Sequence, residues 1–267
     1  MKINDILRNN KNINKSIKLL ALSYILKIEV NNLLLYEKDL TKKELKKYNN
    51  IIKKSTKKPI QYILKEAYFY DDMYYVDKNV LIPRPETEKL VIETEKIIKD
   101  MFDKPSILEI GTGSGVIAIT LKKLNKDSYI TATDISKKAL KIAKKNKKDL
   151  DIELIQTNIT DGIDKKYDVI ISNPPYIKTN DKNVEDIVKN NEPHIALFAE
   201  DNGLYFYKEI LKRSKKLLNV PGVIAFEIGH DEKEEITNLA KKTYPNSKII
   251  TKKDYNDFDR YVFIINE

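Results

Sequence analysis

The chain has 267 residues, contains no cysteine, and carries 49 basic against 40 acidic side chains, which gives a net charge of +9. The length allows one large domain plus a small one, and the lack of cysteine excludes a disulfide framework, a thiolate metal site and a cysteine nucleophile. No apolar run approaches the ~20 residues that span a bilayer, and no signal or transit peptide is evident, so the sequence predicts a soluble cytoplasmic protein.

The first part of the chain is basic and patterned as helices. Residues 1–80 carry 17 basic and 9 acidic side chains, a net charge of +8, whereas residues 81–267 carry 32 and 31. Thr41-Lys42-Lys43-Glu44 is a capping box that predicts a helix start. The excess of lysine is either a solvated surface or a docking face for an acidic or RNA-associated partner.

A β-hairpin is expected next, because the aromatic runs Tyr68–Tyr70 and Met73–Val76 flank Asp71-Asp72. The predicted organisation is therefore a helical substrate-recognition domain at 1–66, a hairpin linker at 67–82 and a catalytic domain at 83–267.

From residue 105 onward, apolar runs alternate with helical patterns, which predicts an α/β fold with a doubly wound, mostly parallel sheet. A short loop joins the last two runs, which we expect to form an antiparallel edge. The seven predicted strands are Ile107–Ile110, Tyr129–Thr133, Ile152–Gln156, Asp168–Ser172, Val223–Ile228, Lys248–Thr251 and Tyr261–Ile265.

A glycine-rich loop follows the first of these strands, with three of the seven glycines of the chain in Gly111-Thr112-Gly113-Ser114-Gly115. A strand, a glycine loop and a helix in this order bring backbone N–H groups and a helix N-terminus to an anionic group. Asp134 follows Gly113 by 21 residues, which is typical of an acid that binds a ribose. Both NAD and S-adenosylmethionine fit. Alternatively, Asp134 only caps the helix that follows it.

Glu109, at the end of the strand before the loop, favours S-adenosylmethionine, because its carboxylate suits the cationic α-amino group of that molecule. The segment Asn173-Pro174-Pro175-Tyr176 favours it too. Two prolines fix φ, remove two N–H groups and hold Asn173 extended. This leaves the Asn173 amide and nearby carbonyl oxygens to accept the N–H groups of a planar –NH2, as methylation of an amide or nucleobase nitrogen requires. An ordinary proline-rich turn is the alternative.

With these elements in this order, the chain resembles the class I, seven-stranded methyltransferases, and more narrowly the release-factor glutamine N5-methyltransferases of the HemK-like family. The resemblance covers nearly the full length. Besides the loop and the Asn173 segment, it is carried by Pro59–Ile63, Phe69-Tyr70, Ile82–Glu88, Thr133-Asp134, Glu192-Pro193, Ala196-Leu197, Asn202–Leu204, Glu227–Gly229 and Asp259-Arg260.

The resemblance implies methyl transfer from S-adenosylmethionine, with S-adenosylhomocysteine as product, to the glutamine of the Gly-Gly-Gln loop in class I peptide release factors. No metal is expected. The implied cofactor-binding residues are Glu109, Gly111, Thr112, Gly113, Ser114, Gly115, Asp134, Asn173 and the pair Asn158-Ile159, which replaces an acid–aromatic pair of the family. The implied catalytic and substrate-binding residues are Asn173, Pro174, Pro175, Tyr176, Arg84 and Glu192.

Our hypothesis for the chemistry is that Asn173 Oδ1 and the Pro174 carbonyl accept the two substrate N–H groups. These bonds hold the nitrogen facing the methyl group while Tyr176 packs on the flat amide. The scheme requires no general base. We expect a monomer.

Three alternatives remain at this stage. A sibling family methylates a glutamine of a large-subunit ribosomal protein, but it usually reads Pro-Arg-Ser-Pro where this chain has Pro83-Arg84-Pro85-Glu86. A nucleic-acid methyltransferase acting on adenine N6 or guanine N2 would need a flipped or single-stranded base. Residues 1–80 contain no recognisable nucleic-acid-binding motif, so direct nucleic-acid binding is not expected. The third alternative is a ligand-binding adaptor that has lost catalysis.

Overall fold

The computed structural model describes residues 2–9 and 12–267. The chain forms two compact units, one of Met1–Glu66 with Glu185–Asn191 and the other of Ala67–Val184 with Glu192–Glu267. The segment Glu185–Asn191 lies inside the predicted catalytic domain but packs with the first unit, where the Asn191 amide donates to the Lys57 carbonyl at 3.1 Å. The hairpin predicted as a linker belongs to the second unit.

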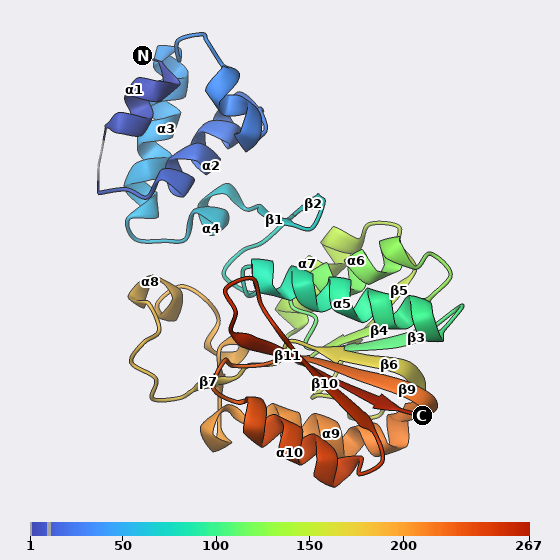
Figure 1. The fold of residues 1–267 in the computed structure, drawn as a ribbon. Helices are drawn as coiled ribbons and strands as arrows, with labels where there is room; N and C mark the ends of the chain where they lie inside the picture. Colours follow the sequence, from blue (N-terminus) through green and yellow to red (C-terminus); the bar gives the residue numbers. More distant parts are fainter. Residues whose placement is uncertain (1, 10–11) are drawn as a thin grey trace. The chain divides into compact units, whose positions relative to one another are not determined.

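Short helices surround one apolar core in the first unit (Figure 1). Helix α3 begins at the capping box predicted from the sequence, because the Thr41 hydroxyl accepts from the Glu44 amide and the Glu44 carboxylate accepts from the Thr41 amide. The inner face of α3, with Tyr48, Ile51 and Ile52, belongs to this core. The helices are α1 (Ile3–Arg8), α2 (Lys15–Leu26), α3 (Lys42–Ser55), α4 (Ile60–Leu64) and α8 (Asp186–Lys189).

The second unit is built on a seven-stranded sheet in the order β10-β11-β9-β6-β3-β4-β5. Only β11 runs antiparallel to its two neighbours, β9 and β10. The strands are β3 (Ser106–Ile110), β4 (Tyr129–Asp134), β5 (Ile152–Gln156), β6 (Tyr167–Ser172), β9 (Leu218–Glu227), β10 (Lys248–Lys253) and β11 (Asp259–Asn266). The predicted fold class is therefore confirmed. Strand β9 starts five residues earlier than predicted, and β11 lies between β9 and β10.

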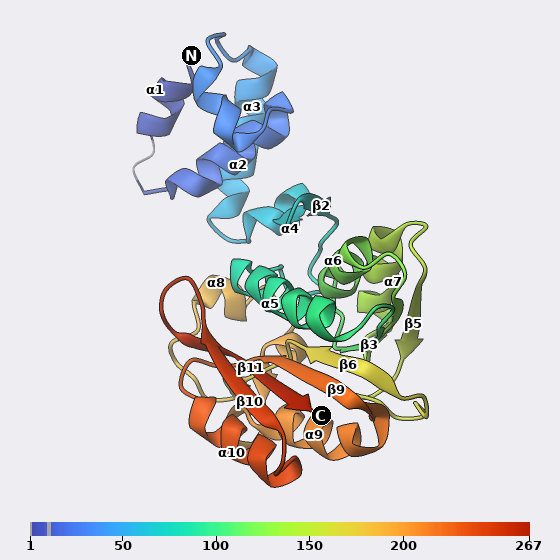
Figure 2. The same ribbon diagram turned by 45° about the vertical axis from the view of Figure 1, so that its right-hand side comes forward.

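Helices cover both faces of this sheet, as Figure 2 shows. Alternate residues of the central strands enter two separate cores, because successive side chains of a strand point to opposite faces. In β6, for example, Val169 and Ile171 join one core and Ile170 the other. Helices α5 (Pro85–Met101) and α6 (Val116–Leu124) pack in the first core, and α9 (Tyr205–Leu217) and α10 (Lys233–Thr243) pack in the second.

The hairpin of β1 (Ala67–Phe69) and β2 (Asp72–Tyr74) is fixed to the second unit through two buried rings. Phe69 and Tyr74 lie in the same core as α5 and contact each other edge to face, with ring centroids 6.2 Å apart. The turn falls at Tyr70 and Asp71, one residue earlier than predicted, with Tyr70 at φ +54°.

Strands β3, β4, β6 and β9 are parallel, so their carboxyl ends lie at one edge of the sheet. Helix α7 (Lys137–Lys147) follows β4, and the short strands β7 (Ile177–Lys178) and β8 (Phe198–Ala199) pair beyond β6. This edge is where ligands bind in sheets of this kind. In the part of the chain that the structure describes, no helix is long and apolar enough to span a membrane.

Candidate active site

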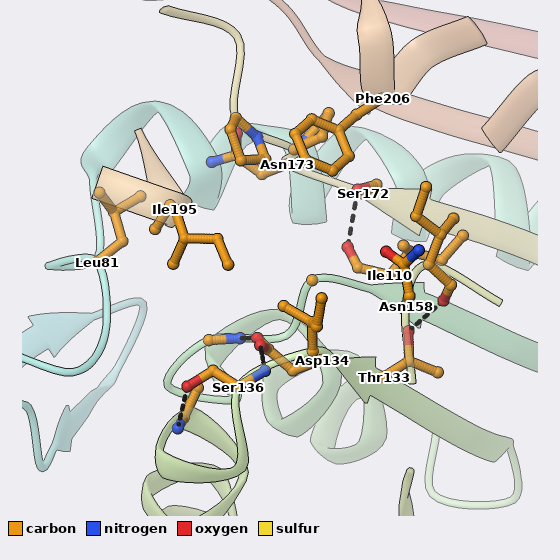
Figure 3. A pocket seen from close by; sticks show the side chains of 18 of the residues that line it. Leu81, Ile110, Thr133, Asp134, Ser136, Asn158, Ser172, Asn173, Ile195 and Phe206 are labelled. Atoms are coloured by element: carbon orange, nitrogen blue, oxygen red, sulfur yellow. Dashed lines mark hydrogen bonds between the residues drawn. The ribbon is translucent and has the colours of Figure 1, made fainter. Parts of the chain in front are cut away.

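A pocket lies at this edge of the sheet, over the carboxyl ends of β3, β4 and β6. Figure 3 shows Asp134 on one side of it and Asn173 with Phe206 on the other. Eight of the predicted site residues line the pocket: Gly111, Gly113, Asp134, Asn158, Ile159, Asn173, Pro174 and Pro175. The sequence thus predicted residues on both sides of one cavity.

The glycine loop needs glycine for two different reasons. Gly111, Gly113 and Gly115 have φ values of +78°, +56° and +86°, where side chains are disfavoured. A Cβ at Gly111 or Gly113 would meet no atom within 4 Å, whereas one at Gly115 would lie 3.2 Å from Ala143 Cβ. The first two glycines therefore leave open space above the loop, and the third lets α6 approach α7.

Backbone N–H groups of the loop are already engaged within the protein. The amides of Gly111 and Thr112 donate to the Thr133 carbonyl at 2.9 and 2.8 Å, and the Gly113 amide donates to Asp134 Oδ2 at 2.9 Å. These bonds fix the loop against β4. The sequence expected loop amides to bind an anionic group, and these three are bonded within the protein.

Glu109 lies beneath the loop and not in the pocket. Its Oε2 accepts from the Thr112 hydroxyl at 2.6 Å and from the Ala118 amide at 3.0 Å. Its Oε1 is buried without a hydrogen-bond partner among the described residues, and burial raises the pKa of this carboxyl to about 7. Glu109 therefore braces the start of α6 and has one polar atom unsatisfied.

Thr112, Ser114 and Gly115 also lie outside the pocket lining, although the sequence placed them in the cofactor site. Ser114 is held from below, since its carbonyl accepts from Asn146 Nδ2 at 2.8 Å. The Asn146 side chain also bonds the Tyr75 backbone in both directions. Thr112 and Ser114 thus connect the loop to neighbouring elements, while Gly111 and Gly113 line the cavity.

Asp134 reaches the pocket with both carboxylate oxygens bonded to backbone amides. Oδ2 accepts from Gly113, and Oδ1 accepts from Ser136 at 2.8 Å. Desolvation raises the pKa of Asp134, and these two backbone bonds oppose the rise. The cap of α7 is Ser136, whose hydroxyl accepts from the Ala139 amide, so Asp134 is not that cap.

Ile159 forms part of the pocket wall in a strained backbone conformation. Its φ is +56°, which is uncommon for a β-branched residue. The Thr133 hydroxyl donates to the Ile159 carbonyl at 3.1 Å and holds it in place. Asn158, its neighbour, is exposed and also lines the pocket. Strain of this kind is concentrated at functional sites.

Asn173 is held by a buried hydrogen-bond relay. Its Nδ2 donates to Thr87 Oγ1 at 3.0 Å, and Thr87 Oγ1 donates to Glu227 Oε2 at 2.7 Å. No described residue donates a hydrogen bond to Asn173 Oδ1. Thr87 stands in the first turn of α5 and Glu227 at the end of β9, so distant parts of the chain meet at this amide.

Tyr176 does not line the pocket, contrary to the stacking role expected for it. Its ring packs against the core beneath α9 and α10, and its hydroxyl lies 3.5 Å from Glu227 Oε1. Its carbonyl backs onto Gly203, where a Cβ would lie only 2.5 Å away. Tyr176 thus anchors the segment from below, and Phe206 is the labelled aromatic ring near Asn173 in Figure 3.

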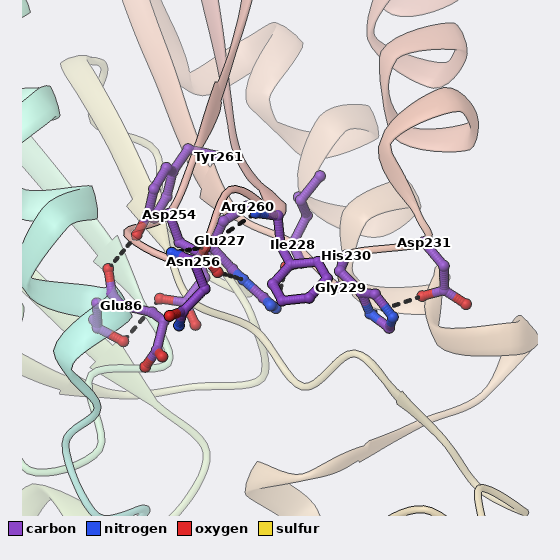
Figure 4. A network of polar contacts seen from close by, with 12 residues as sticks. Glu86, Glu227, Ile228, Gly229, His230, Asp231, Asp254, Asn256, Arg260 and Tyr261 are labelled. Atoms are coloured by element: carbon purple, nitrogen blue, oxygen red, sulfur yellow. Dashed lines mark hydrogen bonds and ion pairs between the residues drawn. The ribbon is translucent and has the colours of Figure 1, made fainter.

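A polar network surrounds Glu227 at the end of β9 (Figure 4). Arg260 donates to the Ile228 carbonyl at 3.0 Å and to Asp254 Oδ2 at 3.2 Å, and Tyr261 donates to the Glu86 carbonyl at 2.6 Å. Burial raises the pKa of Glu227 to about 7, although Thr87 and Arg260 oppose this. The network ties β9, β11 and the start of α5 together behind Asn173.

Arg84 and Glu192 form an ion pair at 2.6 Å, and neither lines the pocket. Glu192 Oε2 also accepts from the Ile82 amide at 3.0 Å, and its side chain is only 1% exposed. This ion pair joins the segment that precedes α5 to the segment that contains Glu192 and Ile195. Leu81 and Ile195, which these segments carry, do line the pocket.

The sequence did not predict Thr87, Glu227, Leu81, Ile195 or Phe206 as site residues. For Thr87 and Glu227 a signal existed, because both stand in motifs that carry the family resemblance. Leu81, Ile195 and Phe206 gave no signal, since apolar residues next to a turn are common in any core.

Known proteins resemble this chain in sequence and in fold. The family described as "Methyltransferase small domain" matches residues 89–196. The release factor glutamine methyltransferase of Streptococcus pneumoniae is 42% identical over 212 residues, covering 78% of this chain and 75% of the relative. The enzyme of the same name from Bacillus cereus is 34% identical and covers 91% and 90%.

Among solved structures, the ribosomal protein L11 methylase of Lactobacillus delbrueckii subsp. bulgaricus superposes with a TM-score of 0.51 at 19% identity, covering 68% of this chain and 79% of that one. At this identity the likeness supports the fold alone. The methyltransferase domain implies the use of S-adenosylmethionine. On the identity and coverage of its sequence relatives, the chain belongs to the release factor glutamine methyltransferases.

Proposed function

We propose that this enzyme transfers a methyl group from S-adenosylmethionine to the side-chain amide nitrogen of the glutamine in the Gly-Gly-Gln motif of class I release factors. The observation that carries the proposal is the Asn173 amide, held at Nδ2 and open at Oδ1 on the wall of the pocket. An acceptor in this position suits a substrate –NH2 group. The names of the relatives supply the identity of the substrate protein.

The residues on the other side of the pocket fit S-adenosylmethionine. Asp134 offers a carboxylate whose oxygens each keep a free lone pair for ribose hydroxyls. Gly111 and Gly113 leave space above the loop, and Glu109 holds the loop from beneath through Thr112 and Ala118. When bound, S-adenosylmethionine supplies an electrophilic methyl group on a positively charged sulfur. Asn158 and Ile159 form the wall that would border the adenine.

The chemical task of the protein is to orient a weak nucleophile. An amide nitrogen reacts poorly because its lone pair is delocalised into the carbonyl. Asn173 Oδ1 and the Pro174 carbonyl accept the two substrate N–H bonds and favour positive charge on the nitrogen as the new bond forms. Pro175 keeps this segment stiff and removes a competing donor. Tyr176 holds the segment from beneath through Glu227.

Docking of the release factor is proposed for the outer face of α3. Residues 42–58 contain eight lysines and one acid, Glu44. None of these lysines forms an ion pair with another described residue. Several of them stand three or four residues apart, where like charges on a helix repel each other. Lys42 and Lys43 also oppose the helix dipole at the N-terminus of α3. Lysines in these positions destabilise the helix locally, and an acidic surface on a partner would offset their repulsion. This supports docking of the release factor here.

The experiment that tests the function offers labelled S-adenosylmethionine with purified class I release factor, ribosomal protein or duplex DNA. We expect label only in the release factor. Preferential labelling of a ribosomal protein would assign the enzyme to the sibling activity, and labelling of DNA would place it among the nucleic-acid enzymes. Absence of any label with bound cofactor would indicate a binding protein.

A further inference from the structure

The relay at Asn173 has a fixed direction, and the chemistry of its groups determines it. Thr87 Oγ1 lies 2.7 Å from Glu227 Oε2 and 3.0 Å from Asn173 Nδ2. A hydroxyl has one hydrogen to donate, and an ionised carboxylate only accepts. Thr87 therefore donates to Glu227, and the same oxygen can only accept from its other neighbour. That neighbour must be the –NH2 half of the Asn173 amide.

We propose that Thr87 and Glu227 are positioning residues, which hold Asn173 with its –NH2 toward Thr87 and its Oδ1 toward the substrate amide. This inference rests on the proposed function. The two halves of an asparagine amide have nearly the same shape, so packing alone does not choose between them. In the reverse orientation, Asn173 would present N–H groups to the N–H groups of the substrate, and the acceptor would be lost.

Burial makes the relay hard to replace by water. Thr87 is 4% exposed and Glu227 is 2% exposed. The Tyr176 hydroxyl lies 3.5 Å from the other carboxylate oxygen, and the Tyr207 hydroxyl donates to the Glu227 carbonyl at 2.8 Å. Since Glu227 is held on several sides, it gives Thr87 a fixed acceptor. A missing Thr87 hydroxyl would remove the nearest acceptor of Asn173 Nδ2 and leave it only the Glu227 carboxylate, with which the Asn173 side chain also interacts.

Ionisation of Glu227 is the condition for this direction. Burial raises the pKa of its carboxyl to about 7. A protonated carboxyl could donate to Thr87, and the direction of the relay would no longer be determined. The tests are therefore run at a pH about one unit above this pKa, where most of the Glu227 carboxyl is ionised. The titratable groups that face Glu227 come from α5, the Asn173 segment, α9 and β11, and they are Glu86, Tyr176, Tyr207, Arg260 and Tyr261.

The kinetic test compares Thr87→Val, which removes the hydroxyl at nearly constant volume, with Thr87→Ser, which keeps it. We expect Thr87→Val to lower kcat on release factor about tenfold, the equivalent of one lost hydrogen bond, with little change in KM. Thr87→Ser should restore most of kcat. In an Asn173→Asp background the change to Val should have little further effect, because a carboxylate has two equivalent oxygens and no –NH2 to orient.

A second readout needs neither substrate nor activity. In uniformly 15N-labelled enzyme, the Asn173 –NH2 signal is assigned by its loss in Asn173→Asp. We expect slow hydrogen exchange of this group in the wild type and in Thr87→Ser, and fast exchange in Thr87→Val. If Thr87→Val does not fold, Glu227→Gln replaces it, since a glutamine –NH2 facing Thr87 lets the hydroxyl donate to Asn173 instead.

The outcomes separate the two proposals. Equal exchange of the Asn173 –NH2 group in all variants, or an unchanged kcat in Thr87→Val, overturns the relay. Failure of the wild-type enzyme to methylate any release factor overturns the proposed function instead, and the exchange measurement then still decides whether the relay exists.

Discussion

Glu109 and Glu227 hold opposite halves of the pocket, and they do so by different means. Both are buried carboxylates at the ends of strands, on β3 and β9, which flank β6 in the sheet. Burial raises the pKa of each to about 7. Glu109 bonds Thr112 and Ala118, three and nine residues away along the chain. Glu227 bonds Thr87, 140 residues away.

This difference indicates how each half is made. The half at Glu109 is a strand, a loop and a helix that follow one another, and the adjacent strand β4 holds the loop through Thr133 and Asp134. The half at Glu227 exists only when the start of α5, the end of β6 and the end of β9 have come together. We therefore expect changes in tertiary packing to disturb the Asn173 side before they disturb the glycine loop.

The largest effect is expected from Asn173→Ala, which removes the acceptor from the Glu227 half. The fold should persist, since Pro174 and Pro175 still restrict the turn. We expect kcat to fall on the order of 10²–10³-fold, as when one preorganised polar group is removed from an oxyanion site. Steady-state kinetics with release factor measures this, and calorimetry should find cofactor affinity close to that of the wild type. A kcat within twofold of the wild type would disprove the mechanism.

Asp134→Ala tests the half of the pocket that is formed by the glycine loop and the end of β4. It removes the carboxylate that Gly113 and Ser136 hold at the pocket, and we expect a loss of about 1.5–3 kcal/mol in the binding of S-adenosylmethionine. Asp127→Ala is the matched control, because Asp127 is an exposed acid just before β4, whereas Asp134 is the last residue of that strand. Unchanged affinity in calorimetry would remove Asp134 from the cofactor site. Tighter binding of NADH than of S-adenosylmethionine would overturn the choice of cofactor.

The two glutamates should also leave a signature in stability. A carboxyl whose pKa rises from 4.5 to about 7 on folding binds more protons in the folded state within that interval. Its stabilising contribution is present below 4.5 and is lost as the pH rises to about 7. Denaturant titrations should show the free energy of unfolding falling less steeply with pH in Glu109→Gln and in Glu227→Gln.

Glu44→Gln is the control for that measurement. Backbone and side-chain hydrogen bonds from Thr41 lower the pKa of Glu44, so its contribution is lost on acidification and not on raising the pH. This variant should keep the wild-type slope between pH 4.5 and 7. If the slopes of both buried-glutamate variants equal that of the wild type, the two carboxyls do not titrate in this interval.

The smallest effect concerns α3, outside both halves of the pocket. Replacing Lys43, Lys46, Lys47 and Lys53 by glutamine keeps helix-forming side chains and removes four charges. At about 0.2–0.5 kcal/mol for each exposed pair, the loss of four pairs should raise KM for release factor about fourfold to thirtyfold, with less salt dependence. The control replaces Lys215, Lys216, Lys241 and Lys242, which are exposed at the ends of α9 and α10. Equal effects in both variants would argue against docking on α3.

The sequence predicted segments in both halves of the site, but not which of their side chains line the pocket. All seven strands, the glycine loop, Asp134 and Asn173 could be predicted, because each depends on a short pattern. The sequence could not show that Ser114 faces away from the cavity, since the alternation of φ in the loop turns some residues inward and others outward. It also could not show that Glu109, a residue of β3, lies beneath the loop, bonded to Thr112 and Ala118. Nor could it orient the Tyr176 ring, which depends on Glu227 and Gly203 from distant segments.

Thr87 and Glu227 show the limit most clearly. Both residues stand in motifs that carry the family resemblance, but the role of each depends on a contact between residues 140 positions apart in the sequence. Propensity and spacing carry no information about such a contact. The segment Glu185–Asn191 gives a second example, since its place with the helical unit depends on packing and not on its own sequence.

The most direct test maps the methyl group on the release factor by tandem mass spectrometry after incubation with this enzyme and S-adenosylmethionine. We predict one added methyl on the side-chain nitrogen of the glutamine in Gly-Gly-Gln, and almost none with Asn173→Ala at equal time. A methyl group on another residue, or full modification by Asn173→Ala, would contradict the assignment of this pocket and of Asn173 as its acceptor.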